Sequence, residues 1–568
     1  MSGNAVVGLS DKSGGLIMDR KNFEKTDVLI VGAGPAGLAC AITAKKQYPG
    51  MRVCVVDKSP IPGGHNISGA ALEQGPIQNL LNMTVKDWRQ APIVHDVLSR
   101  TVASDEVYML SKKGHTRLTS LLNLAADLHL PSGEILSGGD YIVSISKLTR
   151  LLACIAKNIG VELLFGLSAE DLVYNGNCAI GVQFADKLTP DAAKSPDYFP
   201  SGWAVDADYI VLAEGCDGFV TEKFVNHCGL VRKQPPIFAV GAKEIIEVSA
   251  QQYKAFGDSS AVHLPGYPLW QPLRGPSIIG CSKMYSMGGN RIAVVLMTNL
   301  SWKYPDFTPQ KAFALLKEHP FVSRYIMDGK VMENGAKMLP QGGYYSIPTD
   351  PKTSSIGKNN VVLVGDSASF LNPHRQRGIG NAIISGMTAG YALGNIQNKA
   401  LFAEQYTDML RSNGLLENLK RYSKYRQIVA RLGIDIGLPL SGISRVLPFM
   451  RISPDNQVMD KSDYPFEPRE AVDRKSFIRH SGAKYNENHK CHIEIKDLDV
   501  CKWECMRTYD CPCLQFCPAG VFDRVLEHIQ PLNSANCLHC RSCERKCPYN
   551  NIYWSLPQAT EGPRYQYC

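Results

Sequence analysis

Cysteines are concentrated at the C-terminal end of the chain. Of the 18 cysteines, seven lie in residues 1–490 and eleven lie in residues 491–568. Four of the second group follow one another at gaps of two, two and three residues and precede a proline: Cys537, Cys540, Cys543 and Cys547. Three thiolates at such short gaps can surround one corner of an iron–sulfur cubane, whereas zinc usually takes two separated Cys-x2-Cys pairs. The spacing therefore predicts a [4Fe–4S] cluster.

A second, less regular group of cysteines lies upstream of this run. Cys513 and Cys517 are separated by three residues and Pro518 follows, which repeats the end of the downstream run. In the pattern typical of bacterial ferredoxins, the first three cysteines of a run bind one cluster and the fourth binds the other. This pattern predicts that Cys517 completes the first cluster, whose other ligands are Cys537, Cys540 and Cys543.

The same pattern predicts a second [4Fe–4S] cluster, completed by Cys547. We expect its other ligands to come from the upstream group, and the set that we predict is Cys501, Cys505 and Cys513. Because the upstream gaps are irregular, Cys511 is an alternative to Cys513 or to Cys505. Cys491 and Cys568 stand apart from both groups, and we interpret them as non-ligands.

A glycine-rich turn near the N-terminus is the other feature with chemical meaning. Gly32, Gly34 and Gly37 fit Gly-x-Gly-x-x-Gly between an apolar strand and a helix predicted over residues 36–47. The first glycine permits a tight turn, the second lets the backbone approach a pyrophosphate, and the third lets helix and strand pack closely. Asp57 ends the next predicted strand, 20 residues after Gly37, where a carboxylate can accept hydrogen bonds from ribose hydroxyls. We predict a dinucleotide site.

Two later segments favour FAD over NAD as the dinucleotide. Glu214 and Gly215 follow one buried strand, and Gly365 and Asp366 follow another. A Gly-Asp pair at this place resembles the pair that contacts the ribityl chain and the pyrophosphate in glutathione-reductase-like flavoproteins of the hydroxylase type. Two glycines before the next helix, Gly378 and Gly380, would leave room for the flavin ring. No second glycine-rich strand–helix unit is evident, so no separate NAD(P)H domain is predicted.

The order of the predicted elements indicates an α/β protein built of several parts. We predict a glutathione-reductase-like FAD domain of the Rossmann type with an inserted antiparallel-sheet domain for the substrate, followed by an α+β ferredoxin-like domain. The predicted parts are a disordered lead-in at 1–26, a discontinuous FAD domain at 27–234 and 349–400, the inserted domain at 235–348, a helical segment and linker at 401–490, and the ferredoxin-like domain at 491–568.

Composition agrees with a globular protein of about two or three domains. The 568 residues are 44% apolar and 20% charged, with a formal net charge of +8 that only weakly favours an anionic membrane surface or an acidic partner. No stretch of uncharged apolar residues approaches the length of a transmembrane helix. The first 26 residues lack the apolar region of a secretory signal.

Taken over nearly its whole length, the sequence resembles the electron-transfer flavoprotein:quinone oxidoreductase family. Similar segments occur in that family in the same order, and they are Val31–Leu38, Ser68–Leu72, Ala213–Cys216, Gly241–Glu244, Gly335–Lys337, Gly342–Gly343, Ser346–Pro348 and Phe516–Gly520. The sequence departs from the family at Asp57, where glutamate is frequent. It also departs at Cys547 and the upstream cysteines, which single-cluster members lack and two-cluster ferredoxin-like subunits possess.

The resemblance implies that reduced electron-transfer flavoprotein passes electrons through [4Fe–4S] clusters and FAD to a membrane quinone. No catalytic side chain is named, because the cofactors carry the redox chemistry. The residues expected to contact FAD are Gly32, Gly34, Pro35, Ala36, Gly37, Asp57, Lys58, Gly64, Ser68, Gly69, Glu214, Gly215, Gly365, Asp366, Gly378, Gly380 and Asn381. The inserted domain at 235–348 would then hold the quinone.

Quinones are apolar, so the resemblance also implies a protein peripheral to a membrane, with no nucleic acid among its partners. The candidate membrane surface is residues 428–450, which are apolar but interrupted by charges and prolines. A pair of core helices is the alternative interpretation of this segment. The expected location is the cytoplasmic face of a bacterial or archaeal inner membrane, or else the matrix face of the mitochondrial inner membrane.

Two other functions remain open at this stage. A flavin-dependent prenyl-lipid reductase of the geranylgeranyl type shares the flavin fold, although most such enzymes lack a long fused two-cluster tail. A quinone-linked subunit of an electron-bifurcating flavoprotein complex is consistent with that tail. The reaction partner separates these functions, because the first saturates a lipid chain and the second requires partner subunits for turnover with NADH.

Overall fold

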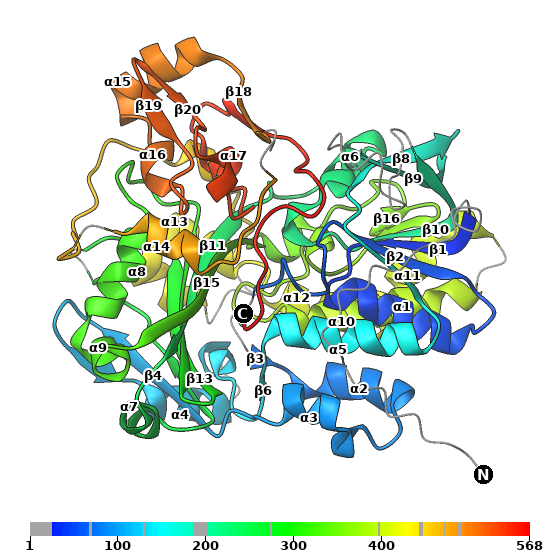
Figure 1. The fold of residues 1–568 in the computed structure, drawn as a ribbon, viewed down its shortest axis with the longest axis horizontal. Helices are drawn as coiled ribbons and strands as arrows, with labels where there is room; N and C mark the ends of the chain where they lie inside the picture. The colour runs from blue at the N-terminus through cyan, green and yellow to red at the C-terminus, as the bar shows by residue number, and fades with distance from the viewer. Residues whose placement is uncertain are drawn as a thin grey trace.

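The computed structural model of the protein describes residues 25–67, 71–128, 131–185, 203–272, 275–395, 398–441, 447–470, 472–486 and 491–568. Two large β-sheets with their helices make up most of the molecule, and the cysteine-rich C-terminal segment packs on the half that contains the second sheet (Figure 1). The predicted lead-in at 1–26 lies almost wholly outside the described residues.

The first sheet has eight strands in the order β16-β17-β10-β1-β2-β7, with the hairpin β8–β9 attached beside β10. Its strands are β1 (Lys25–Val31), β2 (Val53–Asp57), β7 (Glu162–Phe165), β8 (Ala169–Asn175), β9 (Cys178–Phe184), β10 (Ala204–Leu212), β16 (Gly357–Lys358) and β17 (Val361–Leu363). The central strand β1 pairs in parallel with both β10 and β2. Because both faces of β1 are covered, it is an almost continuous apolar run.

The helices that pack around the first sheet include α1 (Pro35–Gln47), α2 (Gln74–Thr84), α3 (Pro92–Leu98), α5 (Ile145–Asn158), α6 (Phe219–His227), α10 (Ile379–Ala392), α11 (Phe402–Ser412) and α12 (Leu415–Arg421). Helices α1 and α10 approach each other closely because α10 carries glycines where they meet. A Cβ atom on Gly386 would lie 2.1 Å from the Ala36 carbonyl oxygen, and one on Gly390 would lie 2.8 Å from that of Cys40. This close approach brings α10 beside the glycine-rich turn that opens α1.

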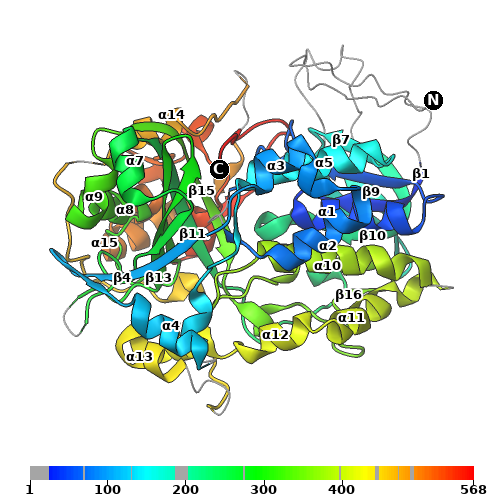
Figure 2. The same ribbon diagram turned by 90° about the horizontal axis from the view of Figure 1, so that it is seen from below.

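The second sheet has seven strands in the order β15-β11-β14-β13-β12-β4-β5. They are β4 (Ser104–Leu110), β5 (His115–Arg117), β11 (Phe238–Glu247), β12 (Ser260–His263), β13 (Gly280–Gly288), β14 (Arg291–Asn299) and β15 (Lys330–Pro340). The short helices α4 (Thr119–Asp127), α7 (Ala250–Phe256), α8 (Pro309–Glu318) and α9 (Pro320–Ile326) belong to the same half (Figure 2). A two-stranded pairing of β3 (Ala71–Leu72) with β6 (Tyr141–Ile142) lies between the two halves.

Two predicted boundaries differ from the structure. Residues 104–117, predicted within the FAD domain, form β4 and β5 of the second sheet, since β4 pairs in parallel with β12. Because β4 and β12 are far apart in the sequence, no local pattern in either stretch shows that they pair. The predicted linker within 401–490 is packed rather than free, because the aromatic rings of Tyr464 and Phe466 are buried in the core of the second half.

The cysteine-rich segment shares one hydrophobic core with the second sheet. Phe516, Val521 and Trp554 of this segment belong to the same cluster of buried side chains as Val240 of β11 and Leu296 of β14. The elements of the segment are β18 (Ile493–Ile495), a π-helix at Val500–Cys505, α15 (Met506–Tyr509), α16 (Cys513–Phe516), β19 (Asp523–Val525), β20 (His528–Gln530), α17 (Ser542–Lys546) and β21 (Ile552–Trp554). Its cysteines are thus held rigidly against the second sheet.

The last described residues return from the cysteine-rich segment and pass between the two sheets. The Tyr565 N–H donates to the Gly64 carbonyl at 2.8 Å on the first half. The Glu333 carboxylate of β15 accepts the backbone N–H groups of Gln566, Tyr567 and Cys568 at 2.6, 2.9 and 2.6 Å. The Glu333 carboxylate of the second sheet therefore fixes the C-terminal residues 566–568, and the neighbouring Tyr565 contacts the first half.

Candidate functional site

One cavity of about 580 Å³ lies between the two sheets. At one end it is lined by the glycine-rich turn after β1 and by the end of β2, including Gly32 and Asp57. At the other end it is lined by side chains of α4 and of α13 (Tyr425–Leu440), including Leu122 and Val429. The cavity is continuous, so a group bound at the turn and a group bound near α13 would share its walls.

The glycine-rich turn has the backbone geometry that a bound pyrophosphate requires. Gly32 has a φ of 109°, and a Cβ atom there would lie 2.3 Å from the Ala213 carbonyl oxygen. A Cβ atom on Gly37 would lie 2.0 Å from the Gly32 carbonyl oxygen. Helix α1 begins at Pro35, and no side chain caps its N-terminus. Its first N–H groups therefore face the cavity and are suited to an anion.

Asp57 lines the cavity and also holds the turn together. Its Oδ2 accepts the Ala33 N–H at 2.7 Å, and its Oδ1 accepts the Ser59 N–H at 2.7 Å. Each carboxylate oxygen keeps a further lone pair for a ribose hydroxyl. The carboxylate thus links the first turn to the loop after β2.

Glu214 lies at the cavity wall, but its carboxylate binds the start of α6. It accepts the Thr221 N–H and hydroxyl, both at 2.7 Å, and the Val220 N–H at 3.3 Å. Burial raises the pKa of Glu214, while these hydrogen bonds oppose the rise. Glu214 therefore orients the β10–α6 connection, and it also forms part of the cavity wall.

All seventeen residues predicted to contact FAD, including those just described, divide into three groups. Ten of the seventeen line the cavity, and they are Gly32, Gly34, Pro35, Ala36, Asp57, Lys58, Glu214, Gly215, Asp366 and Gly378. Five lie close behind the wall without lining it, and they are Gly37, Gly64, Gly365, Gly380 and Asn381. Ser68 and Gly69 lie outside the described residues.

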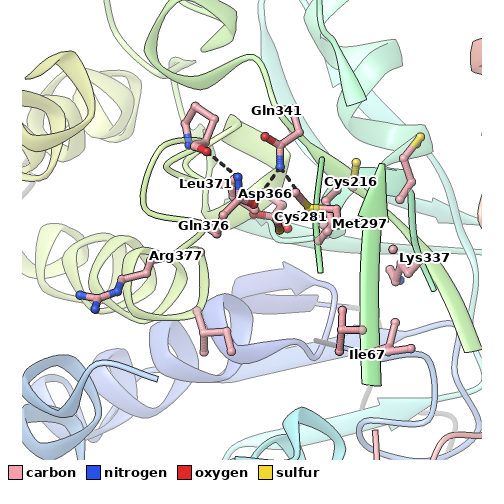
Figure 3. Close-up of a pocket in the computed structure, with 18 of the residues that line it drawn as sticks. Ile67, Cys216, Cys281, Met297, Lys337, Gln341, Asp366, Leu371, Gln376 and Arg377 are labelled. Atoms are coloured by element: carbon pink, nitrogen blue, oxygen red, sulfur yellow. Dashed lines mark hydrogen bonds between the residues drawn. The ribbon is translucent and has the colours of Figure 1, made fainter. Parts of the chain in front are cut away.

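The loop that leads into α10 is fixed by hydrogen bonds between its own residues and the second sheet. The Asn381 side chain donates to the Phe370 carbonyl at 2.7 Å. Gln341, which follows β15, donates to Gln376 at 3.4 Å (Figure 3). Asp366, Leu371 and Gln376 gather around one part of the cavity in this view. The loop therefore closes the cavity where the two halves meet.

Several wall residues come from the second sheet and were not predicted from the sequence. They are Lys243, His263, Cys281, Lys283, Met297 and Lys337. The Lys337 ammonium donates to the His65 carbonyl at 3.1 Å, which joins β15 to the loop after β2. The alternation of side chains along these strands shows which residues share one face of the sheet. The sequence does not show that this face borders a cavity.

The far end of the cavity is apolar and lies beside α4 and α13. Leu118, Leu122, Val429 and Ile434 line it. Helix α13 is interrupted at Gly433, which has a φ of 73°. Residues 442–446 of the predicted membrane segment lie outside the described residues.

Leucines of α4 and an isoleucine of α13 also face solvent near this end of the cavity. The exposed fractions of Leu121, Leu124 and Leu128 are 63%, 55% and 61%, and that of Ile436 is 58%. Both helices lie at the lower edge of the molecule in Figure 2. Helix α4 was missed by sequence reasoning, although four leucines in residues 121–128 were a usable signal. No helix in the described ranges is long and apolar enough to cross a membrane.

Four buried cysteines converge in one part of the C-terminal segment, and they are Cys517, Cys537, Cys540 and Cys543. Burial raises the pKa of Cys543, and the neighbouring thiols Cys517, Cys540 and Cys537 raise it further. Backbone N–H groups donate to two of the sulfurs, with Val521 3.4 Å from Cys517 Sγ and His539 3.4 Å from Cys537 Sγ. A negatively charged sulfur cluster is suited to such donors.

Five other cysteines line a small separate cavity, and they are Cys501, Cys505, Cys511, Cys513 and Cys547. Asn551 joins two of them, since its N–H donates to Cys547 Sγ and its side chain donates to Cys501 Sγ, both at 3.2 Å. Cys547 thus lies with the upstream group, and Cys517 lies with the downstream run.

Among the described residues, no three of these sulfurs lie within 4.8 Å of one another, as the thiolates of one zinc ion would. Zinc holds its thiolates about 3.8 Å apart, which follows from tetrahedral Zn–S bonds of about 2.3 Å. Among the described residues, the set of three ligand atoms within 4.8 Å of one another is His492, Cys537 and His539, and it contains one cysteine. None of the nine cysteines is in a disulfide. All are therefore available as ligands.

Imidazole and indole rings fill the space between the downstream cysteines and the large cavity. The ring centroids of His539 and His65 are 5.9 Å apart, and His65 lines the cavity. Trp554 lies 5.4 Å from His539 and 5.6 Å from Phe219, which also lines the cavity. These contacts place one cysteine group next to the large cavity and the other farther along the segment.

Comparisons with known proteins match three separate stretches of the chain, one in each of its main parts. Residues 470–566 match the family model described as electron transfer flavoprotein-ubiquinone oxidoreductase, 4Fe-4S. Residues 238–339 match that of ETF-QO, ubiquinone-binding, and residues 30–98 match an NAD(P)-binding Rossmann-like domain.

Full-length relatives and solved structures give the same picture. A mitochondrial electron transfer flavoprotein-ubiquinone oxidoreductase of Oryza sativa subsp. japonica is 29% identical over 95% of this chain and 92% of its own length. That of Pseudomonas aeruginosa is 29% identical over 96% of this chain and 100% of its own. A geranylgeranyl bacteriochlorophyll reductase-like structure from Thermoplasma acidophilum has a TM-score of 0.50 at 17% identity, over 76% of this chain and 94% of that chain, which indicates fold alone.

The α/β fold and the site define the class as an oxidoreductase that combines a flavin with iron–sulfur chemistry. A flavin-dependent brominase with a TM-score of 0.50 at 15% identity, over 73% of this chain and 90% of its own, has the same fold. The 4Fe-4S and ubiquinone-binding models, together with relatives of that name matched over nearly the whole chain, support the electron-transfer flavoprotein:quinone oxidoreductase family for this protein.

The glycine turn generates a direct prediction. We expect Gly32→Ala to abolish flavin binding, because its Cβ atom would meet the Ala213 carbonyl at 2.3 Å in a backbone conformation that alanine rarely adopts. The measurement is flavin absorbance per mole of purified protein, with the iron content as a check on the C-terminal segment. Gly50→Ala is the matched control, because no atom lies within 4 Å of a Cβ there. A Gly32→Ala protein with a full complement of flavin would contradict the assignment of this turn.

Proposed function

We propose that the protein takes electrons from reduced electron-transfer flavoprotein and passes them through iron–sulfur chemistry and FAD to a membrane quinone. The observation that carries this proposal is the continuous cavity, which joins a dinucleotide turn to an apolar end at α4 and α13 and which also borders a buried cysteine group through His65. Relatives that match the chain over nearly their whole length have the corresponding name. The match over 238–339 falls on the wall of that cavity.

The protein's own residues would bind and orient the cofactors. FAD, when bound, exchanges two electrons, and each cluster exchanges one. The N-terminus of α1 and the Gly32 turn would hold the pyrophosphate, and Asp57 would accept a ribose hydroxyl. Lys58 and Asp366, which line the same end, would contact the rest of the dinucleotide. The apolar walls near α4 and α13 would exclude water from the flavin side of a bound quinone.

We also propose two [4Fe–4S] clusters and a ligand set for each. The first would be held by Cys517, Cys537, Cys540 and Cys543, and the second by Cys547 with Cys501, Cys505 and Cys513. The shared cavity of Cys547 with the upstream cysteines supports this crosswise pairing. Cys511 lines that cavity too and remains the alternative fourth ligand.

The finer description of the fold is part of the proposal. The parallel strands with α1 and α10 are consistent with a glutathione-reductase-like FAD domain, formed chiefly by residues 27–234 and 349–400. The antiparallel strands of 235–348 would form the quinone domain, to which β4 and β5 are added. Residues 491–568 would be a ferredoxin-like domain, since two short strand pairs flank two cysteine groups.

We further propose that the protein binds a membrane surface as a peripheral protein, through α4 and α13. Their exposed leucines and isoleucine lie beside the apolar end of the cavity, so a quinone could enter from the acyl-chain region without crossing water. Relatives include mitochondrial and bacterial proteins. The cytoplasmic face of an inner membrane, or the matrix face in a mitochondrion, would supply the quinone.

The central experiment mixes the purified protein with reduced electron-transfer flavoprotein and a soluble short-chain quinone. We expect quinone reduction that depends on both components. No quinone reduction, together with NADH turnover that requires partner subunits, would instead identify a subunit of an electron-bifurcating complex. Saturation of a prenyl lipid would identify a lipid reductase. Oxidation of the flavoprotein and formation of quinol, both followed by absorbance, distinguish the three outcomes.

The two-cluster proposal predicts about eight irons per flavin, from two [4Fe–4S] centres. Cys547→Ser should lower the count to about four and remove one of two interacting EPR signals, because Cys547 would be a ligand of the second cluster alone. Cys491→Ser is the control and should keep about eight irons, since Cys491 Sγ donates to the Ile493 carbonyl and lies outside both groups. About four irons in the unaltered protein would rule out the second cluster.

The membrane proposal predicts that Leu124→Glu weakens binding to vesicles of phosphatidylcholine and phosphatidylglycerol. Losing the burial of one leucine costs about 1.5–3 kcal/mol, so partitioning should fall about tenfold or more. The matched control is Leu526→Glu, because Leu526 is 89% exposed at the tip of the β19–β20 hairpin, at the opposite end of the molecule in Figure 1. Equal vesicle binding by both variants would place the membrane surface elsewhere. The fraction of each variant that sediments with the vesicles is the measurement.

A further inference from the structure

Two ionisable side chains line a largely apolar stretch of the cavity wall, and a buried carboxylate lies behind them. The two side chains are His263 on β12 and Lys283 on β13, and the carboxylate is that of Asp105 on β4. His263 and Lys283 are directly opposite each other in the antiparallel pairing of β12 with β13, and both line the cavity. Their neighbours along the wall are Val107, Met109, Leu118, Leu122, Ile135 and Leu264. Ionisable groups are costly at such a place unless they have a function or strong partners.

His263 contacts Asp105 directly, and Lys283 is linked to Asp105 through Ser137. His263 Nε2 lies 3.0 Å from Asp105 Oδ1. The other oxygen of Asp105 accepts the backbone N–H of Ser137, and the Lys283 ammonium donates to the Ser137 hydroxyl at 3.0 Å. A carboxylate that holds one nitrogen of an imidazole fixes its tautomer and leaves the other nitrogen free to face a ligand. This arrangement fits a proton-transfer group better than a simple packing contact.

We propose that His263 delivers protons to the carbonyl oxygens of a quinone bound in this cavity, with Asp105 as its positioning residue and Lys283 as a cation that stabilises the reduced oxygen. The inference rests on the proposed function, which supplies the quinone and the electrons. A quinone gains two electrons and two protons to become a hydroquinone. In each proton step an imidazolium N–H bond breaks, an O–H bond forms on the quinone oxygen, and neutral imidazole remains.

The charges around His263 suit this cycle. Burial lowers the pKa of His263, Lys283 and Arg377 lower it further, and Asp105 raises it. The ring therefore releases its proton readily when the cavity is empty. Negative charge arriving on a quinone oxygen favours the protonated ring at the same place. Proton uptake by His263 would then be coupled to electron arrival.

A string of charged groups leads from the pair toward solvent, and it marks a polar route along which water would resupply the proton. Lys283 lies in the field of both Asp105 and Asp140. Arg377 contacts Asp140 at 3.0 Å and Glu73 at 2.9 Å. Burial raises the pKa of Asp140, and the neighbouring Arg377 opposes the rise.

The string continues to the surface beside α12. Arg375 lies 3.3 Å from Glu73 and 3.7 Å from Glu134. Arg421, whose side chain is 41% exposed, lies 3.4 Å from Glu134. Carboxylates alternating with cations thus connect the apolar cavity to water, on a route that does not pass through the apolar end of the cavity at α4 and α13.

The test compares His263→Gln with the unaltered protein in two assays. Electrons from reduced electron-transfer flavoprotein are passed either to a soluble quinone or to ferricenium, which takes one electron and no proton. We expect His263→Gln to lower quinone reduction by about a hundredfold, the lower end of the effect of general acid–base catalysis, and to leave ferricenium reduction unchanged. The unaltered rate should rise as the pH falls, and this dependence should flatten in the variant.

Further variants separate proton delivery from a structural role. Asp105→Asn should give a smaller loss with the same selectivity for quinone, since the ring remains but loses its orienting charge. His115→Gln is the matched control, because His115 is an exposed histidine on β5 of the same sheet. Added imidazole should partly restore quinone reduction to His263→Gln, which it would not do if the variant were only misfolded.

The possible failures are distinguishable. Quinone reduction by His263→Gln at the unaltered rate and with the unaltered pH profile would overturn this inference alone. An equal loss in the quinone and ferricenium assays would also overturn it, since the residue would then act on folding or on electron transfer. An unaltered protein that reduces ferricenium but no quinone would overturn the proposed function, and the inference with it.

Discussion

The buried ammonium group of Lys546 ties the cysteine-rich segment to the rest of the molecule. Its Nζ donates to the carbonyls of Trp302 at 2.5 Å and Asp455 at 3.1 Å, both outside the segment. The Asp455 carboxylate in turn accepts the Phe238 N–H at 2.7 Å, where β11 begins. Burial lowers the pKa of Lys546, and Asp455 opposes the fall. A charge desolvated to this extent is tolerated only with such partners, so the contact specifies one position of the segment.

The rest of the site depends on that position. Lys546 lies at the end of α17 and directly precedes Cys547, so the link to Trp302 fixes the run of cysteines against the second sheet. The common hydrophobic core extends the same constraint to Phe516 and Trp554. His539 and His65 then meet across the boundary between the C-terminal segment and the flavin half. A small shift of the segment would separate the cysteines from the cavity, even if the cysteine groups and the cavity each kept their own structure.

Sequence reasoning can locate chemistry that is local in the chain. The Gly32 turn, the acid at Asp57 and the cysteine gaps are each contained in one short stretch. In the structure, Cys517 lies near the downstream run and Cys547 lies with the upstream cysteines. Asp366 and Gly378 were placed through a family resemblance, and both line the cavity.

Sequence reasoning failed where distant strands combine. Asp105 and His263 are 158 residues apart, and no local signal shows that β4 joins β12. Glu214 lines the cavity, but its carboxylate also binds Thr221 at a helix start that the sequence does not reveal. The packed aromatic residues Tyr464 and Phe466 were mistaken for a linker, since prolines and charges around them dominate the composition.

The continuity of the cavity between the sheets has a thermodynamic consequence. No wall divides the dinucleotide end from the apolar end, and Gly378, Leu371 and Cys281 border the same space. Ligands at the two ends therefore share contacts, and occupation of one end changes the free energy of occupying the other. Such coupling is reciprocal: whatever factor a bound flavin adds to the affinity for an apolar ligand, that ligand adds to the affinity for the flavin. In this protein, retention of a flavin and affinity for an apolar ligand would therefore be thermodynamically linked.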